Sequence, residues 1–274
     1  MSRRHSFYAR PLLAAAAAVT VLAGTAAATP ADGSPDLHTA TTAATALDDT
    51  YYQDALGKTG AELKAALHTI ISDQTKLSYS QVWDALKATD EDPANSSNVV
   101  LLYTGRSQSK NDNGGNSGQW NREHVWAKSH GDFGTATGPG TDVHHLRPED
   151  VQVNSTRGNK DFDNGGSELG NAPGNCTDGD SFEPRDAVKG DVARMILYMA
   201  VRYEGNDSFA DLEPNDQVSN GSAPKMGKLS VLKQWSQEDP PDTFEKRRND
   251  VIFEQFQHNR NPFIDHPEWV GSIW

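Results

Sequence analysis

The sequence of 274 residues contains one cysteine, Cys176. A single thiol closes no disulfide within the chain and forms no cysteine-based zinc site. The fold must therefore depend on an apolar core and on any metal that other ligand types bind. Roughly 225 residues follow the terminal segments described below, enough for one domain that buries most of its apolar surface.

Positive charge is also scarce. Asp and Glu outnumber Lys and Arg by 38 to 25, and the formal net charge is −13. Removal of the three arginines that precede residue 29 takes three positive charges from −13 and leaves −16. Such a field repels polyanions, so a nucleic-acid partner requires a local basic groove or a divalent cation. The alternative is that the acidity serves solubility alone.

The apolar run near the amino terminus, Leu12–Leu22, is too short for a membrane span, which needs about 20 residues. Three arginines precede it and small residues follow it, a pattern typical of a secretory signal peptide. We predict a signal peptide over residues 1–28, a disordered linker or propeptide over 29–48, and one secreted, folded domain over 49–274 with no membrane partner.

Helical periodicity dominates that domain. Capping patterns at Thr59–Glu62 and Ser78–Gln81 predict two helices, and apolar residues from Val188 to Tyr203 predict the longest helix of the second half. Another helix is predicted from Asp242 to about Gln257. It carries the basic triplet Lys246–Arg248, which indicates a solvated face or a phosphate contact.

Few strands are predicted. The apolar run Val99–Tyr103 favours a buried strand, and Pro148 followed by two carboxylates favours a helix start. Residues 161–180 and 259–274 lack periodicity and are predicted to be irregular. These elements predict an α+β fold, a mostly helical single domain with a small sheet.

A dense set of reactive side chains lies between residues 121 and 159. His124 has an ordinary pKa of about 6.5, which suits a general base near neutrality. Glu123 and Asn154 offer oxygen ligands suited to Mg²⁺, Mn²⁺ or Ca²⁺. Glu123 and His124 are neighbours, which face opposite sides of a regular strand, so they share a site only where the backbone is bulged or turning.

The same stretch contains arginines suited to an anion such as phosphate: Arg122, Arg147 and Arg157. His144 and His145 are predicted to support the site rather than act as bases, and Asp142 is close enough in sequence to orient one of them. Spacing alone leaves two other interpretations open, a set of structural histidines with surface carboxylates and a non-catalytic calcium site.

Several motifs occur in a defined order: Arg122-Glu123-His124-Val125, HHLRPEDVQVN from His144, Arg157-Gly158-Asn159, GDVARMILYM from Gly190 and NRNPFID from Asn259. In this order the sequence resembles the bacterial endonuclease I family of secreted and periplasmic nucleases, in the His-Me finger (ββα-metal) group. The resemblance extends from about residue 83 to residue 263. It implies a ββα-metal core in which a β-hairpin supplies the base and the following helix supplies the asparagine.

The resemblance implies a secreted, metal-dependent endonuclease that cleaves DNA, and RNA as well, with little sequence specificity and with 5′-phosphate products. His124 would be the general base, and Glu123 and Asn154 would be the protein ligands of one Mg²⁺, with Mn²⁺ or Ca²⁺ as alternatives. The arginine that stabilises the phosphate is not mapped by the motifs, and Arg147 and Arg157 are both candidates.

The sequence departs from the family pattern in two respects, and two other functions would also be compatible with it. Several family members are rich in disulfides, whereas this chain has one cysteine, and the segment between residues 125 and 141 is short. A secreted phosphodiesterase acting on small esters, or a non-catalytic, calcium-stabilised binding module, would also fit the composition. The chain is expected to be a monomer.

Overall fold

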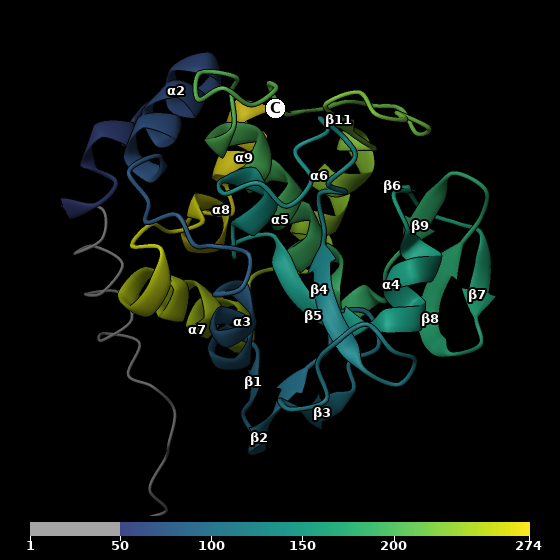
Figure 1. Cartoon of the computed structure of the whole chain (residues 1–274). Coiled ribbons are helices and arrows are strands. Elements are labelled where there is room, and N and C mark those ends of the chain that lie inside the picture. The colour runs from purple at the N-terminus through teal and green to yellow at the C-terminus, as the bar shows by residue number, and fades with distance from the viewer. Residues whose placement is uncertain (1–49) are drawn as a thin grey trace, which may run out of the picture.

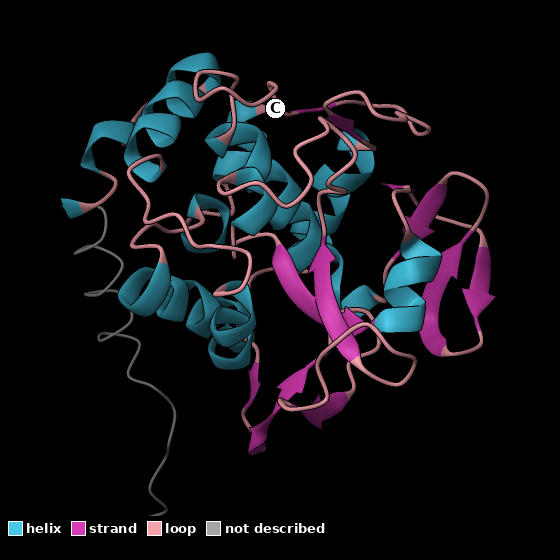
Figure 2. Ribbon diagram, in the orientation of Figure 1, coloured by secondary structure: helices cyan, strands magenta, loops and turns pink. Residues whose placement is uncertain are grey.

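The structure is a computed structural model that describes residues 50–274. The predicted signal peptide and linker lie outside these residues. Helices and short strands are mixed along the chain, as predicted. In Figures 1 and 2, β4 (Trp120–His124) and β5 (Leu146–Asp150) cross the middle of the molecule, between a group of helices and a small sheet.

The helices surround the central strands mainly on one side. Within the described residues no helix is long and apolar enough to cross a membrane. The α-helices are α2 (Gly60–Ile71), α3 (Val82–Thr89), α4 (Val151–Arg157), α5 (Lys189–Arg202), α6 (Leu229–Glu238), α7 (Thr243–Val251), α8 (Pro262–Asp265) and α9 (Trp269–Ile273). Shorter helical turns are η1 (Gln53–Ala55), η2 (Pro139–Thr141), η3 (Asp186–Val188) and the π-helical η4 (Ile252–Phe256).

The remaining strands are short and form separate small sheets. One sheet has the order β1-β2-β3, one pairs β10 with β11, and one has the order β6-β9-β8-β7. Their bounds are β1 (Glu91–Asp92), β2 (Asn95–Val100), β3 (Ser107–Ser109), β6 (Asp161–Phe162), β7 (Ser167–Leu169), β8 (Ala172–Thr177), β9 (Ser181–Glu183), β10 (Glu213–Pro214) and β11 (Lys225–Met226).

The central helix is α5, which confirms the helix predicted from Val188 to Tyr203. Residues from Gly190 to Arg202 are all buried, because α2, α6 and α8 pack around the helix. Its polar side chains are therefore paired inside the protein. Arg194, for example, donates to the Glu245 carboxylate of α7 at 2.7 and 2.6 Å.

Two apolar clusters form the core, and β4 passes between them. Trp120 of β4 and Leu146 of β5 belong to the smaller cluster, together with residues of α3. Val125 and Trp126, directly after β4, belong to the larger cluster, as does Val153 of α4. Close packing on both sides leaves the backbone between Trp120 and Val125 little freedom to move.

A compact unit is formed by β4, β5 and α4. The two strands pair antiparallel without interruption, with Arg122 opposite Pro148 and His124 opposite Leu146. Helix α4 follows β5 directly and contacts both strands. Residues from the end of β4 and from α4 are thereby brought to one place.

The helix predicted to start at Pro148 starts later. Pro148 lies within β5, where its carbonyl accepts a hydrogen bond from the Leu102 N–H at 3.0 Å. Asp150 is the true cap, because its carboxylate accepts from the N–H groups of Gln152 and Val153. The acidic side chain thus satisfies donors at the helix start, as capping residues do.

Other segments also differ from the expectation. Strand β2 ends at Val100, so it overlaps the predicted strand Val99–Tyr103 by only its last two residues. Residues 161–180, predicted to be irregular, contain most of the four-stranded sheet, and residues 259–274 contain α8 and α9. These elements are two to six residues long, too short for a periodic pattern to indicate them.

A buried group of charges joins β5 to α7 and to the end of α3. Asp90 is fully buried and accepts hydrogen bonds from the Nε atoms of Arg147 and Arg248, at 2.5 and 3.3 Å. Arg147 also donates to Asp191 at 3.2 Å. Arg248 is thus a buried cation of the core. The triplet Lys246–Arg248 was predicted to form a solvated face or to contact phosphate, and for Arg248 this prediction is wrong.

Substitution Asp90→Ala should lower the free energy of unfolding by about 3–5 kcal/mol, because it leaves the buried Arg248 without a carboxylate and Arg147 with Asp191 alone. Urea unfolding measures the change. The neighbouring Glu91→Ala variant is the control, since Glu91 forms a partly exposed pair with Lys110 and should cost less than about 1 kcal/mol. Equal losses in the two variants would contradict the account.

Candidate active site

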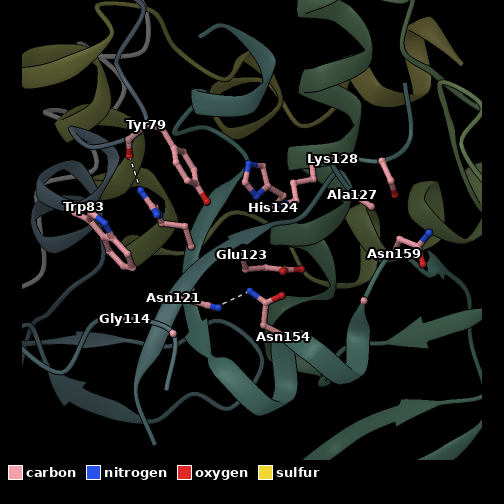
Figure 3. Close-up of a pocket in the computed structure, with 14 residues that line it drawn as sticks. Tyr79, Trp83, Gly114, Asn121, Glu123, His124, Ala127, Lys128, Asn154 and Asn159 are labelled. Atoms are coloured by element: carbon pink, nitrogen blue, oxygen red, sulfur yellow. Dashed lines mark hydrogen bonds between the residues drawn. The ribbon is translucent and has the colours of Figure 1, made fainter. Parts of the chain in front are cut away.

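A pocket of about 620 Å³ opens at the end of β4 (Figure 3). In the close-up, Tyr79 and Trp83 lie on one side of His124, and Ala127, Lys128 and Asn159 lie on the other. The lining residues are Tyr79, Trp83, Gly114, Gly115, Asn121, Arg122, Glu123, His124, Ala127, Lys128, Ser129, Asn154, Gly158 and Asn159. The structure therefore brings together the predicted residues Arg122, Glu123, His124 and Asn154.

Glu123 and His124 both line this pocket although they are neighbours on β4. Of the two expected alternatives, a bulged or a turning backbone, the bulge is absent from this strand pair, whose register runs unbroken from Trp120 to His124. Instead, the strand ends at His124. The backbone leaves the regular strand geometry there, which allows the two side chains to reach the same space.

His124 is almost fully buried, with 6% of its surface exposed. Its Nε2 atom lies 3.1 Å from the Gly140 carbonyl oxygen, which can only accept, so Nε2 carries the proton and Nδ1 has the free lone pair. Burial, reinforced by the nearby His145, holds the pKa of His124 well below its usual value. The imidazole is therefore neutral at neutral pH and can accept a proton at Nδ1.

Glu123 is buried beside this histidine. Its Oε1 atom accepts hydrogen bonds from the Tyr103 hydroxyl at 2.8 Å and from Arg157 at 3.0 Å. Burial raises the pKa of the Glu123 carboxyl, and the charge of Arg157 and these hydrogen bonds oppose that effect. Both hydrogen bonds fall on one oxygen, which leaves the other available to a ligand.

Asn154 lies on α4 and faces the same space. Its side-chain Nδ2 donates to the Asn121 side-chain oxygen at 2.7 Å, which orients the carboxamide. Figure 3 shows the Asn154 oxygen turned toward the Glu123 carboxylate. Two oxygen acceptors that face each other in this way suit a hard cation.

The donor set for a metal is small. Among residues 50–274 there is no group of three or more His, Cys, Asp and Glu side chains that could hold an ion. Glu123 and Asn154 supply one carboxylate and one amide oxygen. This set fits an ion such as Mg²⁺, which usually keeps several waters and takes few protein ligands.

The three predicted arginines have different surroundings. Arg122 lines the pocket. Arg157 is fully buried, and its guanidinium donates to Glu123 and to the carbonyls of His124 and Val125, at 3.0, 2.7 and 2.6 Å. It holds the backbone of the site and is not among the residues that line the pocket. Arg147 lies away from the pocket in its pairs with Asp90 and Asp191, so neither buried arginine is placed to hold a phosphate.

The two consecutive histidines are buried supports. His145 Nε2 donates to the Pro139 carbonyl at 2.7 Å, next to the residue whose carbonyl holds His124. His144 Nε2 lies 3.1 Å from the side-chain oxygen of Asn259. Asp142 contacts the backbone N–H of His144 at 3.0 Å, so it holds the main chain there rather than a ring.

Several lining residues were not singled out from the sequence. Tyr79 lies within the capping pattern Ser78–Gln81, Trp83 follows it in the predicted helix, and Asn121 and Lys128 carried no motif of their own. Asn121 precedes the Arg-Glu-His motif directly, and Lys128 follows His124 by four positions. The side chains of these residues are of types common in functional sites, but only the folded structure shows that they line the pocket.

The family comparison agrees with this geometry. Residues 59–268 match the family Endonuclease I. The matched span includes β4, β5, α4 and every residue that lines the pocket. The protein is a nuclease, an enzyme that hydrolyses nucleic acids. It belongs to the Endonuclease I family, which confirms the resemblance seen in the motifs.

Two relatives are similar over most of the chain. An extracellular ribonuclease of Bacillus amyloliquefaciens is 71% identical over 226 residues, which cover 82% of this chain and 78% of the relative. An extracellular ribonuclease of Bacillus subtilis (strain 168) is 70% identical over 226 residues, with the same coverage.

The two buried histidines, His144 and His145, should make the free energy of unfolding depend on pH. Burial lowers the pKa values of His144 and His145 to about 4. The unfolded chain takes up a proton on each ring near pH 6.5, whereas the folded rings stay neutral until about pH 4. The contribution of these rings to the free energy of unfolding should therefore fall between pH 6.5 and pH 5, by about 2 kcal/mol for each ring. Glu149 and Glu245, whose pKa values burial raises to about 8, contribute in the opposite direction over the same range. Urea unfolding at fixed salt measures this.

The His145→Gln variant provides the control, because it keeps a donor toward Pro139 and removes one titrating ring. The difference in unfolding free energy between wild type and this variant isolates the ring, and it should shift by about 2 kcal/mol against the wild type as the pH falls from 6.5 to 5. A difference that stays constant over this range would contradict the assignment.

Proposed function

We propose that this protein is an extracellular, metal-dependent endonuclease that hydrolyses phosphodiester bonds of RNA and DNA with little sequence specificity. The proposal depends mainly on the surroundings of His124. Its neutral imidazole is held at Nε2 by a backbone carbonyl, and its Nδ1 is available beside two oxygen ligands. The family supports cleavage of nucleic acid, and the names of the two relatives support RNA as a substrate and an extracellular site of action. A signal peptide over residues 1–28 would direct secretion.

His124 acts as the general base. Its Nδ1 takes a proton from a water molecule while the water oxygen attacks the phosphorus. The new oxygen–phosphorus bond forms as the bond from phosphorus to the 3′ oxygen breaks, and the 3′ oxygen takes a proton from solvent. The products are a 5′-phosphate and a free 3′ hydroxyl. The Gly140 carbonyl stabilises the imidazolium that results, because it accepts from Nε2.

Glu123 and Asn154 would hold one Mg²⁺, with Mn²⁺ or Ca²⁺ as possible substitutes. When bound, such an ion stabilises negative charge on the phosphate oxygens and on the leaving oxygen. Asn121 supports this arrangement because it orients the Asn154 amide, and Arg157 supports it because it fixes the Glu123 carboxylate. The β4-β5-α4 unit would then be the ββα-metal core of the His-Me finger group.

Substrate affinity comes from a few local cations. Arg122 and Lys128 line the pocket, and neither forms an ion pair within the described residues. They offset locally the repulsion expected from a net charge of −13. Contacts to backbone phosphates carry no sequence information, so the monomeric enzyme cleaves with little specificity, and its affinity falls steeply with salt.

Replacement His124→Ala should lower the cleavage rate by about two to four orders of magnitude, since the general base is lost. The assay follows digestion of plasmid DNA and of a structureless RNA with Mg²⁺ or Mn²⁺. His258→Asn is the matched control, because His258 is exposed, lies outside the pocket and has a positive φ that Asn tolerates. Identical digestion by the wild type and the His124→Ala variant would contradict the proposal.

Replacement Glu123→Gln should raise the Mg²⁺ concentration required for half-maximal activity by at least about tenfold. The amide keeps an acceptor for Arg157 and Tyr103 but removes the charge that binds a cation. Calorimetric titration with Mn²⁺, without substrate, should show the same weakening. An unchanged metal response in both measurements would mean that Glu123 is not a ligand.

A further inference from the structure

Arg122 is held by aromatic rings. Its guanidinium carbon lies 3.5 Å from the ring centre of Tyr79 and 4.0 Å from that of Trp83. Its NH1 group donates to the Tyr79 carbonyl oxygen at 2.6 Å. Trp83 is in turn packed edge-on against Trp120, with ring centres 5.2 Å apart. The rings are therefore anchored in the smaller core cluster and hold the cation in a defined position.

The buried arginines nearby are held differently. Arg147, Arg157 and Arg248 each pair with a carboxylate, which cancels most of their charge. No ion pair joins Arg122 to any carboxylate of residues 50–274. An aromatic face attracts a guanidinium through its quadrupole and adds no negative charge. Arg122 thus keeps its full charge although it is partly desolvated.

Its hydrogen-bonding capacity is also largely unused. A guanidinium has five N–H donors. Within the described residues only NH1 has an acceptor, and Nε is buried without one. A charged donor group of this kind, lining the pocket that contains His124, suits the oxygens of a phosphate group.

We propose that Tyr79 and Trp83 are positioning residues that hold Arg122 unneutralised, so that its guanidinium binds a backbone phosphate of the nucleic acid beside His124. This inference rests on the proposed function for the identity of the ligand. An acidic protein can in this way keep a cation available to a polyanion. The aromatic rings fix the arginine in place, whereas carboxylates would neutralise its charge. Both positioning residues come from the segment before and within α3, about 40 positions from Arg122 in sequence.

Binding without turnover tests the inference. A fluorescein-labelled decathymidylate is titrated with the full chain in EDTA over a series of NaCl concentrations, and anisotropy gives the affinity. Trp83→Leu should weaken binding about 5- to 30-fold, because the guanidinium loses a stacking partner. Trp83→Phe should restore affinity to within about twofold. Arg122→Ala should weaken binding and lower the salt slope by about 0.7, the value for one contact to a single strand.

The double variant Trp83→Leu/Arg122→Ala decides the role of the ring. If Trp83 acts through Arg122, its replacement causes no further loss once Arg122 is absent. Additive losses would overturn the inference and assign Trp83 to direct stacking on a base. An unchanged affinity in the single Trp83→Leu variant, or no binding by wild type at any salt concentration, would also overturn it.

Phe256→Leu is the matched control for packing. Phe256 packs against the same smaller cluster as Trp83 but does not line the pocket, so its replacement should leave affinity unchanged. If Trp83→Leu fails to fold, Tyr79→Leu takes its place in the same cycle. Cleavage by wild type with Mg²⁺ is measured separately. Binding without cleavage would contradict the proposed function and leave this inference standing.

Discussion

The buried guanidinium of Arg157 holds the candidate site together. It extends from the end of α4 and donates to the Glu123 carboxylate and to the carbonyls of His124 and Val125. Those bonds fix the end of β4 relative to α4, the helix that carries Asn154. His124, Glu123 and Asn154 therefore have defined positions in the folded protein. An arginine expected to contact phosphate acts within the structure instead.

Charge is distributed in this acidic protein according to burial. Inside the core, arginines pair with carboxylates, as Arg147 and Arg248 do with Asp90, because an isolated buried charge is costly. At the pocket, Arg122 is held by Tyr79 and Trp83, which stabilise it without cancelling its charge. Net charge alone argued against a polyanionic substrate, but a substrate responds to the local field of the pocket.

Sequence patterns predicted the long elements and the centre of the site better than the rest. Helix α5 and the participation of Arg122, Glu123, His124 and Asn154 in one pocket follow from periodicity and from the order of the motifs. The four-stranded sheet in 161–183 was missed, since strands of two to six residues leave no periodic signal. The start of α4 was placed too early because Pro148 suits a strand as well as a first helical turn.

The sequence by itself determined the family, the residue types of the candidate site and their order along the chain, because these are local properties. Only the tertiary structure decided which arginine faces the pocket. Arg147, Arg157 and Arg122 have the same side chain, and their surroundings come from segments far away in sequence, namely the end of α3, the end of β4 and the segment around Tyr79. Burial and partners, which depend on those distant contacts, make two of them structural and place the third at the pocket, without a carboxylate partner among the described residues.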